Sequence, residues 1–182
     1  MPKMTGRELK ALIRRLSDVK LDVPQIQKQG DFTCWAGCYR MIDAFHGTTI
    51  PFGQYLKLKN PECTLAGCNI KPCPACDKPR LITDVLRDLR KLSYKGTTSF
   101  TTNPTVAEIK EYLTNKTPLM IFKHNGAAVG HFVLVTGVVM KGLFMNQFLI
   151  VNDPDLHKKK VVDVLDVCLR NGTWSQTWVV SK

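Results

Sequence analysis

The chain has 182 residues, of which 44% are hydrophobic, so it is long enough for a single domain with a sizeable core but holds no apolar run of the ~18 residues that a membrane span needs. Its net charge is +11, yet the basic residues are scattered and not interleaved with aromatics, which argues against a nucleic-acid site and leaves an acidic protein partner open. Residues 1–22 are charged throughout and lack the apolar region of a cleavable signal peptide, so we expect a protein that is cytoplasmic as made, or one secreted by a signal-peptide-independent route.

Four segments in the first two thirds of the chain have apolar residues at helical spacing, and we expect a helix in each of residues 6–18, 34–46, 81–92 and 103–115. The first belongs to an N-terminal helix assigned to residues 1–20. Thr33 is the expected N-cap of the second helix, which Gly47 ends. Pro104 is expected at or near the first position of the fourth helix, where proline is favoured.

Residues 51–80 hold five prolines and four cysteines, and we expect an irregular, cysteine-rich insert there. The cysteines are Cys63, Cys68, Cys73 and Cys76. Four thiolates can hold a structural Zn²⁺ tetrahedrally, although only the last pair has the common C-x2-C spacing. Two disulfides are the other interpretation, and the missing signal peptide gives zinc the preference. The insert contains no histidine, so we expect no catalytic metal, and no cofactor for catalysis.

From residue 118 onward the pattern changes to short segments rich in Val, Ile, Phe and Trp. We expect five strands, at residues 118–124, 131–140, 143–153, 159–167 and 173–181. Helices first and strands afterwards predict an α+β fold with an antiparallel sheet, in one domain that spans residues 1–182.

The stretch GDFTCWAGCYRM, residues 30–41, places Cys34 at the start of the second expected helix. A thiol is a good nucleophile only as the thiolate, and the unpaired N–H groups of a helix N-terminus favour that charge. Cys38 lies one turn later, where this effect fades. We therefore interpret Cys34 as a reactive cysteine and Cys38 as a structural one.

A nucleophile of this kind needs a base, and His131 is the best placed of the four histidines because it follows Gly130 and opens a strand. His124, at the end of the preceding strand, is the local competitor. The base needs an orienting group in turn, and the apolar strand FLIVND ends in Asn152 and Asp153. If this strand lies beside that of His131, a carboxylate at its end can hold the imidazole Nδ1–H.

Acyl transfer also requires two donors for the oxyanion that forms when a nucleophile attacks a carbonyl. The backbone N–H of Cys34 is one candidate donor. A side-chain amide just upstream is the other, and Gln29 and Gln27 are both within range.

The motifs VPQIQKQGDFTCWAG, GHFVLVTGV and FLIVNDP, in this order over about residues 20–155, resemble those of bacterial papain-like cysteine proteases. The closest types are papain-fold effector proteases and bacteriocin-leader peptidases. The resemblance implies a papain-like fold, in which an N-terminal helical part carries the nucleophile and a C-terminal antiparallel sheet carries the histidine and the aspartate. It implies Cys34 as nucleophile, His131 as base and Asp153 as the orienting residue.

The resemblance also implies an upstream glutamine in the oxyanion hole. The usual position of this glutamine falls on Lys28 here if no gap is allowed, between two glutamines. We place the role on Gln29, which lies in the loop that turns into the helix, with Gln27 as the alternative.

The resulting hypothesis is a cysteine peptidase that cleaves peptide bonds of a protein or peptide substrate through a Cys-His-Asp triad and a thioester intermediate. A basic domain of this type resembles a secreted effector or toxin. One alternative keeps the same triad and acts as a deamidase or transglutaminase on glutamine side chains. A second alternative is a basic binding module stabilised by its cysteines or by zinc.

Overall fold

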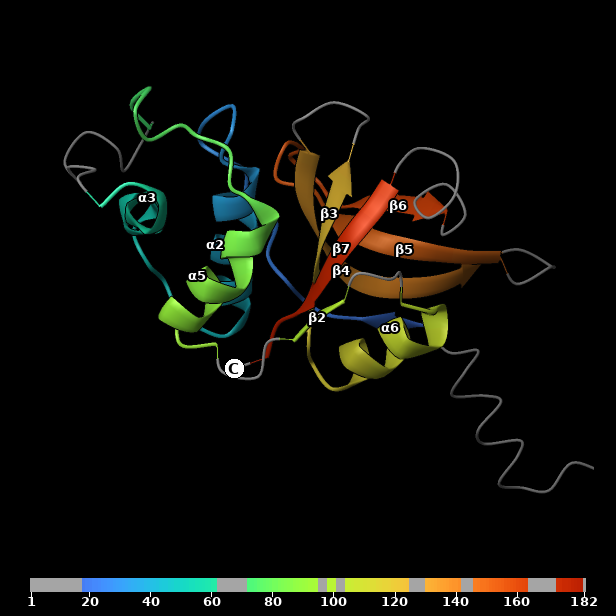
Figure 1. The fold of residues 1–182 in the computed structure, drawn as a ribbon. Helices are drawn as coiled ribbons and strands as arrows, with labels where there is room; N and C mark the ends of the chain where they lie inside the picture. Colours follow the sequence, from blue (N-terminus) through green and yellow to red (C-terminus); the bar gives the residue numbers. More distant parts are fainter. Residues whose placement is uncertain are drawn as a thin grey trace, which may run out of the picture.

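The computed structural model describes residues 18–61, 72–94, 98–100, 104–124, 130–141, 146–163 and 173–181. The helices in these ranges are α2 (Cys34–Phe45), α3 (Phe52–Lys59), the 3-10 turn η1 (Ile82–Asp84), α5 (Val85–Lys91) and α6 (Val106–Thr114). The strands are β1 (Val19–Lys20), β2 (Thr98–Phe100), β3 (Leu119–His124), β4 (Gly130–Lys141), β5 (Asn146–Asn152), β6 (Lys160–Asp163) and β7 (Thr173–Val179). Helices therefore precede most of the strands, which confirms the α+β class (Figure 1).

All the strands join one antiparallel sheet. Its order is β2-β7-β3-β4-β5-β6, and β1 pairs with β4 outside this order. The five expected strands correspond to β3 through β7. Strands β1 and β2 were not expected, because strands of two and three residues are too short to show a hydrophobic period.

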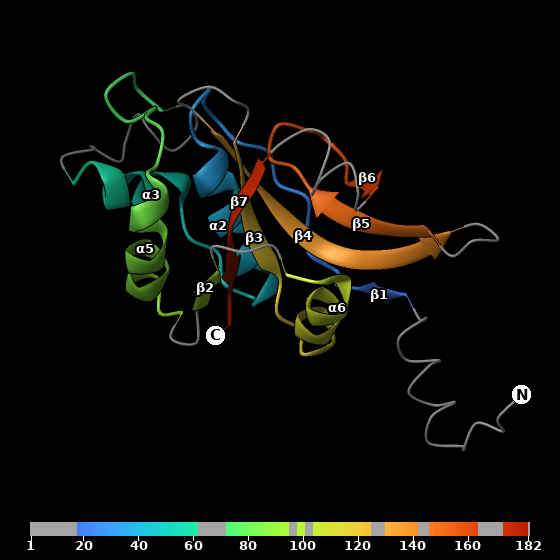
Figure 2. The same ribbon diagram turned by 45° about the vertical axis from the view of Figure 1, so that its right-hand side comes forward.

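The helices and the sheet meet along strand β4. Helices α2, α3 and α5 lie together on one side of the molecule, and α6 lies beside β1 and against β4 (Figure 2). Helix α2 packs against β4 and buries the side chains of Trp35, Tyr39, Met41 and Ile42. The core continues under the sheet, where the rings of Phe132 and Trp178 are 5.8 Å apart. Helix α2 is thereby fixed against strand β4.

The other expected helices are present in shorter form, since 81–92 becomes η1 and α5 and 103–115 becomes α6. Pro104 is near the first helical position, as expected, but not at it. It lies two residues before Val106, because Thr105 and Glu108 form a reciprocal capping box that starts the helix. The helices in the described ranges all fall short of the length and apolar character that a membrane-spanning helix requires.

The expected irregular conformation of residues 51–80 is wrong at its beginning, where helix α3 forms. Phe52, Tyr55 and Leu56 recur at helical spacing and are buried, so they form the apolar face of this helix. The helical pattern was not recognised in the sequence because prolines flank it. Pro51 precedes the first helical residue, a place where proline costs no backbone hydrogen bond.

Some sequence predictions lie outside the described residues. The helix expected within residues 1–20 is among them, except for residues 18–20. There the helix prediction is wrong, because Val19–Lys20 pairs with Val138 and Gly137 and forms β1. Cys63, Cys68 and Cys168 also lie outside. Of the other cysteines in the insert, Cys73 is exposed and Cys76 is buried.

Candidate active site

Helix α2 begins at Cys34, as the sequence predicts, with Thr33 at the N-cap position. The Thr33 hydroxyl does not cap the helix. It accepts a hydrogen bond from the backbone N–H of Gly30 (3.0 Å) and lies 3.2 Å from the Gly30 carbonyl, to which it can donate. The loop before the helix is thereby closed on itself, while the N-terminus of α2, which favours negative charge, carries no Thr33 cap.

The two cysteines of α2 have different surroundings. Cys34 is 8% exposed and lines a cleft, whereas Cys38 is completely buried one turn further along. Burial raises the pKa of the Cys38 thiol, and repulsion by Cys34 and Asp153 adds to the effect. Cys38 therefore stays a neutral thiol in the core, as its structural interpretation requires.

His131 and Asp153 lie at the ends of adjacent strands. Strand β5 pairs with β4 so that Asn152 lies opposite Leu134, and the next residue, Asp153, continues toward the start of β4. His131 Nε2 is 2.7 Å from Asp153 Oδ1. The expected use of Nδ1 for this contact is wrong, because the ring presents Nε2 to the carboxylate. That geometry leaves Nδ1 for the hydrogen bond between His131 and Cys34.

The pKa values of this pair follow from its contacts. Burial acts to lower the pKa of His131, but hydrogen bonds to Asp153 and Cys34 outweigh it and raise the pKa to about 10. Burial acts to raise the pKa of Asp153, but the hydrogen bond from His131 and the attraction of its charge lower it below the ordinary value. At neutral pH the site thus holds an imidazolium between a carboxylate and the Cys34 sulfur.

Asn152 does not compete with Asp153 for the imidazole. Its side chain is completely buried, and its Oδ1 accepts a hydrogen bond from the Thr136 hydroxyl (2.9 Å). Its Nδ2 donates to the carbonyls of Val23 (3.2 Å) and Pro24 (3.3 Å). Asn152 therefore ties the end of β5 to β4 and to the extended segment that leads to the nucleophile loop.

Further contacts join the loop before α2 to the loop after β5. Gln25 donates from Nε2 to the carbonyl of Asp153 (2.7 Å). The backbone N–H of Lys28 donates to the carbonyl of Pro154 (2.9 Å), and its ammonium group forms an ion pair with Asp155 (3.0 Å). Sequence reasoning missed Gln25, because nothing local to a glutamine in a loop indicates a partner 128 residues away.

The oxyanion donors remain a prediction. Gln27 and Gln29 are both half-buried, and Gln29 Oε1 is a buried atom without a hydrogen-bond partner among the described residues. Neither glutamine lines the cleft, whereas Lys28 does. The Lys28 ammonium is held by the carbonyl of Asp31 (2.8 Å) as well as by its ion pair.

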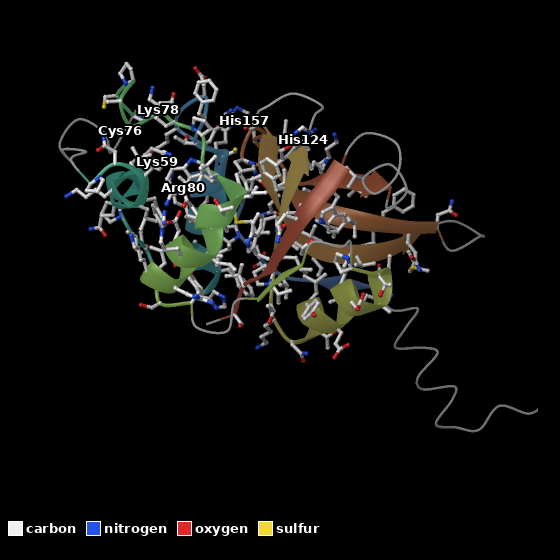
Figure 3. All side chains as sticks on the ribbon, viewed as in Figure 1. Lys59, Cys76, Lys78, Arg80, His124 and His157 are labelled. Carbon is white, nitrogen blue, oxygen red and sulfur yellow. The ribbon has the colours of Figure 1, made fainter. Side chains whose placement is uncertain are left out.

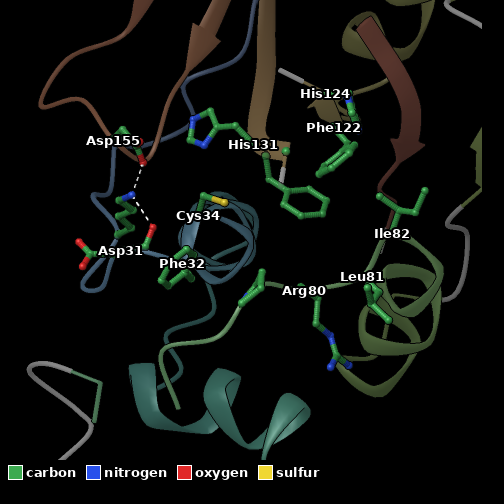
Figure 4. Close-up of a pocket in the computed structure, with 14 residues that line it drawn as sticks. Asp31, Phe32, Cys34, Arg80, Leu81, Ile82, Phe122, His124, His131 and Asp155 are labelled. Atoms are coloured by element: carbon green, nitrogen blue, oxygen red, sulfur yellow. Dashed lines mark hydrogen bonds and ion pairs between the residues drawn. The ribbon is translucent and has the colours of Figure 1, made fainter. Parts of the chain in front are cut away.

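The cleft has a volume of about 460 Å³, with Cys34 and His131 in its wall. Asp31 and Asp155 lie at one end of the cleft, and Leu81, Ile82 and Phe122 lie toward the other end, together with Arg80 and His124 (Figure 4). Lys28 belongs to the first end through its ion pair with Asp155. The apolar lining comprises Phe32, Pro79, Leu81, Ile82, Phe122 and Phe132. Phe32 is 45% and Leu81 63% exposed, so large apolar surface is open to solvent at the rim of the cleft. His124 also lines the cleft, but the carboxylate is paired with His131.

Residues 17–167 match the sequence model of a family described as papain-like cysteine protease AvrRpt2. The chain belongs to this family. It is therefore a cysteine peptidase, a hydrolase of peptide bonds, and the resemblance seen in its motifs is confirmed. Membership in the AvrRpt2 family also favours a peptidase over a basic binding module. No curated protein sequence matches the chain.

Several solved structures resemble this AvrRpt2-family peptidase, including the following two. One is a double glycine motif protease from an AMS/PCAT transporter in complex with the leader peptide, with 16% identity, a TM-score of 0.56, and coverage of 89% of this chain and 93% of that one. The other is UfSP from C. elegans, with 14% identity, a TM-score of 0.49, and coverage of 90% of this chain and 34% of that one. At its identity the first likeness concerns the fold alone, and it supports a papain-like fold.

Proposed function

We propose that this AvrRpt2-family peptidase cleaves protein or peptide substrates with Cys34 as nucleophile, His131 as acid and base, and Asp153 as the orienting residue. The observation that carries the proposal is the position of the His131 ring. Its Nε2 is fixed 2.7 Å from Asp153, and its other nitrogen faces Cys34 at the start of a helix. Family membership supports the further proposal that the protein acts as an effector or toxin.

The arrangement supports acyl transfer in two steps, formation of a thioester on Cys34 and its hydrolysis. The Cys34 sulfur attacks the substrate carbonyl carbon, a C–S bond forms, and the carbonyl π electrons move to oxygen. We assign that oxyanion to the N–H of Cys34, a residue of the cleft wall, and keep Gln29 as the proposed second donor, although its side chain does not line the cleft in this structure. The oxyanion collapses, the C–N bond breaks, and His131 gives its proton to the leaving amine. His131 then takes a proton from water, which hydrolyses the thioester and releases the acid with Cys34 restored.

Mass spectrometry of a treated peptide library tests this function. Wild-type protein should produce new termini on either side of a cleaved bond, and Cys34→Ala at the same concentration should produce none. A gain of about one dalton on glutamine would indicate a deamidase, and a crosslink to lysine a transglutaminase, since both reactions use the same thioester. Either result without new termini would contradict the assignment of peptide bonds as substrate.

We also propose that the cysteine-rich segment binds a structural Zn²⁺ through Cys63, Cys68, Cys73 and Cys76. The described half supports the proposal through its backbone, because the Cys73 carbonyl accepts hydrogen bonds from Cys76 N (2.8 Å) and Asp77 N (2.9 Å), so the C-x2-C pair spans a tight turn. Elemental analysis of Cys34→Ala should find zinc, and a chelator should expose residues 60–80 to proteolysis. A metal-free sample whose segment yields only to a reductant would indicate disulfides instead.

A further inference from the structure

One carboxylate outside the triad holds the backbone just before the nucleophile. Asp77 Oδ2 accepts a hydrogen bond from the N–H of Asp31 (3.0 Å), and Asp77 Oδ1 accepts one from the N–H of Phe32 (2.9 Å). These amides lie three and two residues before Cys34. Hydrogen bonds from backbone N–H to an ionised carboxylate are stronger than those between neutral groups, so Asp77 clamps this turn.

The turn is built to receive that carboxylate. A Cβ atom at Gly30 would lie 2.7 Å from Asp77 Oδ1 and 2.5 Å from the Pro72 ring, so only glycine allows the two segments to approach this closely. The Thr33 hydroxyl closes the same turn through its contacts with Gly30. With both ends fixed, the loop has little freedom to shift the start of α2.

Asp77 itself comes from a well-anchored segment. The Trp35 indole N–H donates to the carbonyl of Lys78 (3.1 Å), which ties the segment to the residue after Cys34. Two residues further on, Arg80 pairs with the fully buried Asp88 of α5 and donates to the Leu58 carbonyl of α3 (3.2 Å). Figure 3 shows Cys76, Lys78 and Arg80 gathered beside these helices. Asp77 is thus held from the helical side of the molecule.

We propose that Asp77 is a positioning residue for the oxyanion hole, an inference that rests on the proposed function of Cys34. The turn that Asp77 clamps begins next to Gln29, the proposed second donor, and leads to the N–H of Cys34, the oxyanion donor that belongs to the cleft wall. Such donors stabilise the transition state only when they lie at hydrogen-bond distance from the developing charge. Asp77 fixes their spacing without touching the substrate.

Two reactions of Cys34 distinguish a role of Asp77 in positioning the oxyanion donors from a role in stabilising the fold. Hydrolysis of N-benzyloxycarbonylglycine p-nitrophenyl ester passes through an oxyanion, whereas alkylation by iodoacetamide displaces iodide from a saturated carbon and forms none. Asp77→Ala should lower kcat for the ester at least about 10-fold with little change in KM, because removal of an oxyanion donor costs more than that elsewhere. The alkylation rate of Cys34 and its pH profile should stay as in wild type.

Asp77→Asn keeps the shape of the side chain and one acceptor oxygen, so its kcat should fall less than that of Asp77→Ala. If the alanine variant does not fold, the asparagine variant is used for the same test. Glu111→Ala, which removes an exposed carboxylate from α6, is the matched control and should behave as wild type. Unchanged ester hydrolysis in folded Asp77→Ala would overturn the proposal, as would a parallel fall in hydrolysis and alkylation. If Cys34→Ala hydrolyses the ester as fast as wild type, the proposed function fails and this inference with it.

Discussion

His131 and Asp153, 22 residues apart in the sequence, meet through the imidazole Nε2 and the carboxylate Oδ1 at 2.7 Å. Their strands are antiparallel neighbours, so the pair forms wherever β4 and β5 are in register. Because Asp153 occupies Nε2, the ring offers Nδ1 to Cys34 on helix α2. The contact between Asp153 and Nε2 therefore orients the imidazole ring so that Nδ1 is the nitrogen that can exchange a proton with Cys34.

The raised pKa of His131 predicts a pH dependence of stability. Hydrogen bonds to Asp153 and Cys34, which outweigh the opposing effect of burial, raise this pKa from 6.5 to about 10. A raised pKa means that the folded protein retains a proton that the unfolded chain has lost, so the stabilisation is complete below pH 6.5 and falls as the pH rises toward 10. The difference in unfolding free energy between wild type and His131→Gln, from urea titrations, should shrink across this window. A difference that grows with pH would contradict the ion pair.

Asn152 and Asp153 should give opposite phenotypes. Asp153→Ala should remain folded and lose at least about 10-fold in kcat, since the imidazole loses its orienting carboxylate. Asn152→Ala should retain activity in the folded fraction but lose about 1–3 kcal/mol of stability, because the buried Thr136 hydroxyl loses its closer acceptor and the carbonyls of Val23 and Pro24 lose a donor. Ester kinetics and urea titrations of both variants check this. If Asn152→Ala lost activity and Asp153→Ala lost only stability, Asn152 rather than Asp153 would be the residue that orients His131.

Gly130 and Gly47 provide a matched pair of glycine substitutions. A Cβ at Gly130 would lie 2.0 Å from the Phe122 ring and 2.6 Å from the Lys123 carbonyl, so Gly130→Ala should shift the start of β4 and with it His131. Gly47 has a φ of +74° and open space around it, so Gly47→Ala should cost about 1–2 kcal/mol of stability and leave kcat unchanged. Wild-type kcat in Gly130→Ala would show that His131 tolerates this shift.

Local signals made much of the fold and site predictable. Cys34 at a helix start and His131 at a strand start are properties of short windows, and the change of hydrophobic period near residue 118 marks the sheet. The order of the motifs then indicated which histidine and which carboxylate belong together.

Contacts between distant segments were not predictable in the same way. Asp77 is 45 residues from Phe32, and Gln25 is 128 residues from Asp153, so no window of sequence contains both partners. Helix α3 was hidden by its flanking prolines, although Tyr55 and Leu56 carry its buried face. The nitrogen that His131 presents to Asp153 depends on ring orientation, which sequence does not encode locally.

The central claim, that Cys34 is the nucleophile, is tested most directly by trapping the acyl-enzyme. Protein mixed with N-benzyloxycarbonylglycine p-nitrophenyl ester is quenched in acid, digested and mapped by mass spectrometry. We predict the acyl group on the Cys34 sulfur in wild type and in Cys38→Ala, where only a buried neutral thiol is lost. We predict no acylated cysteine in Cys34→Ala. An acyl group on Cys38 or on another cysteine, with Cys34 unmodified in folded wild-type protein, would contradict the assignment.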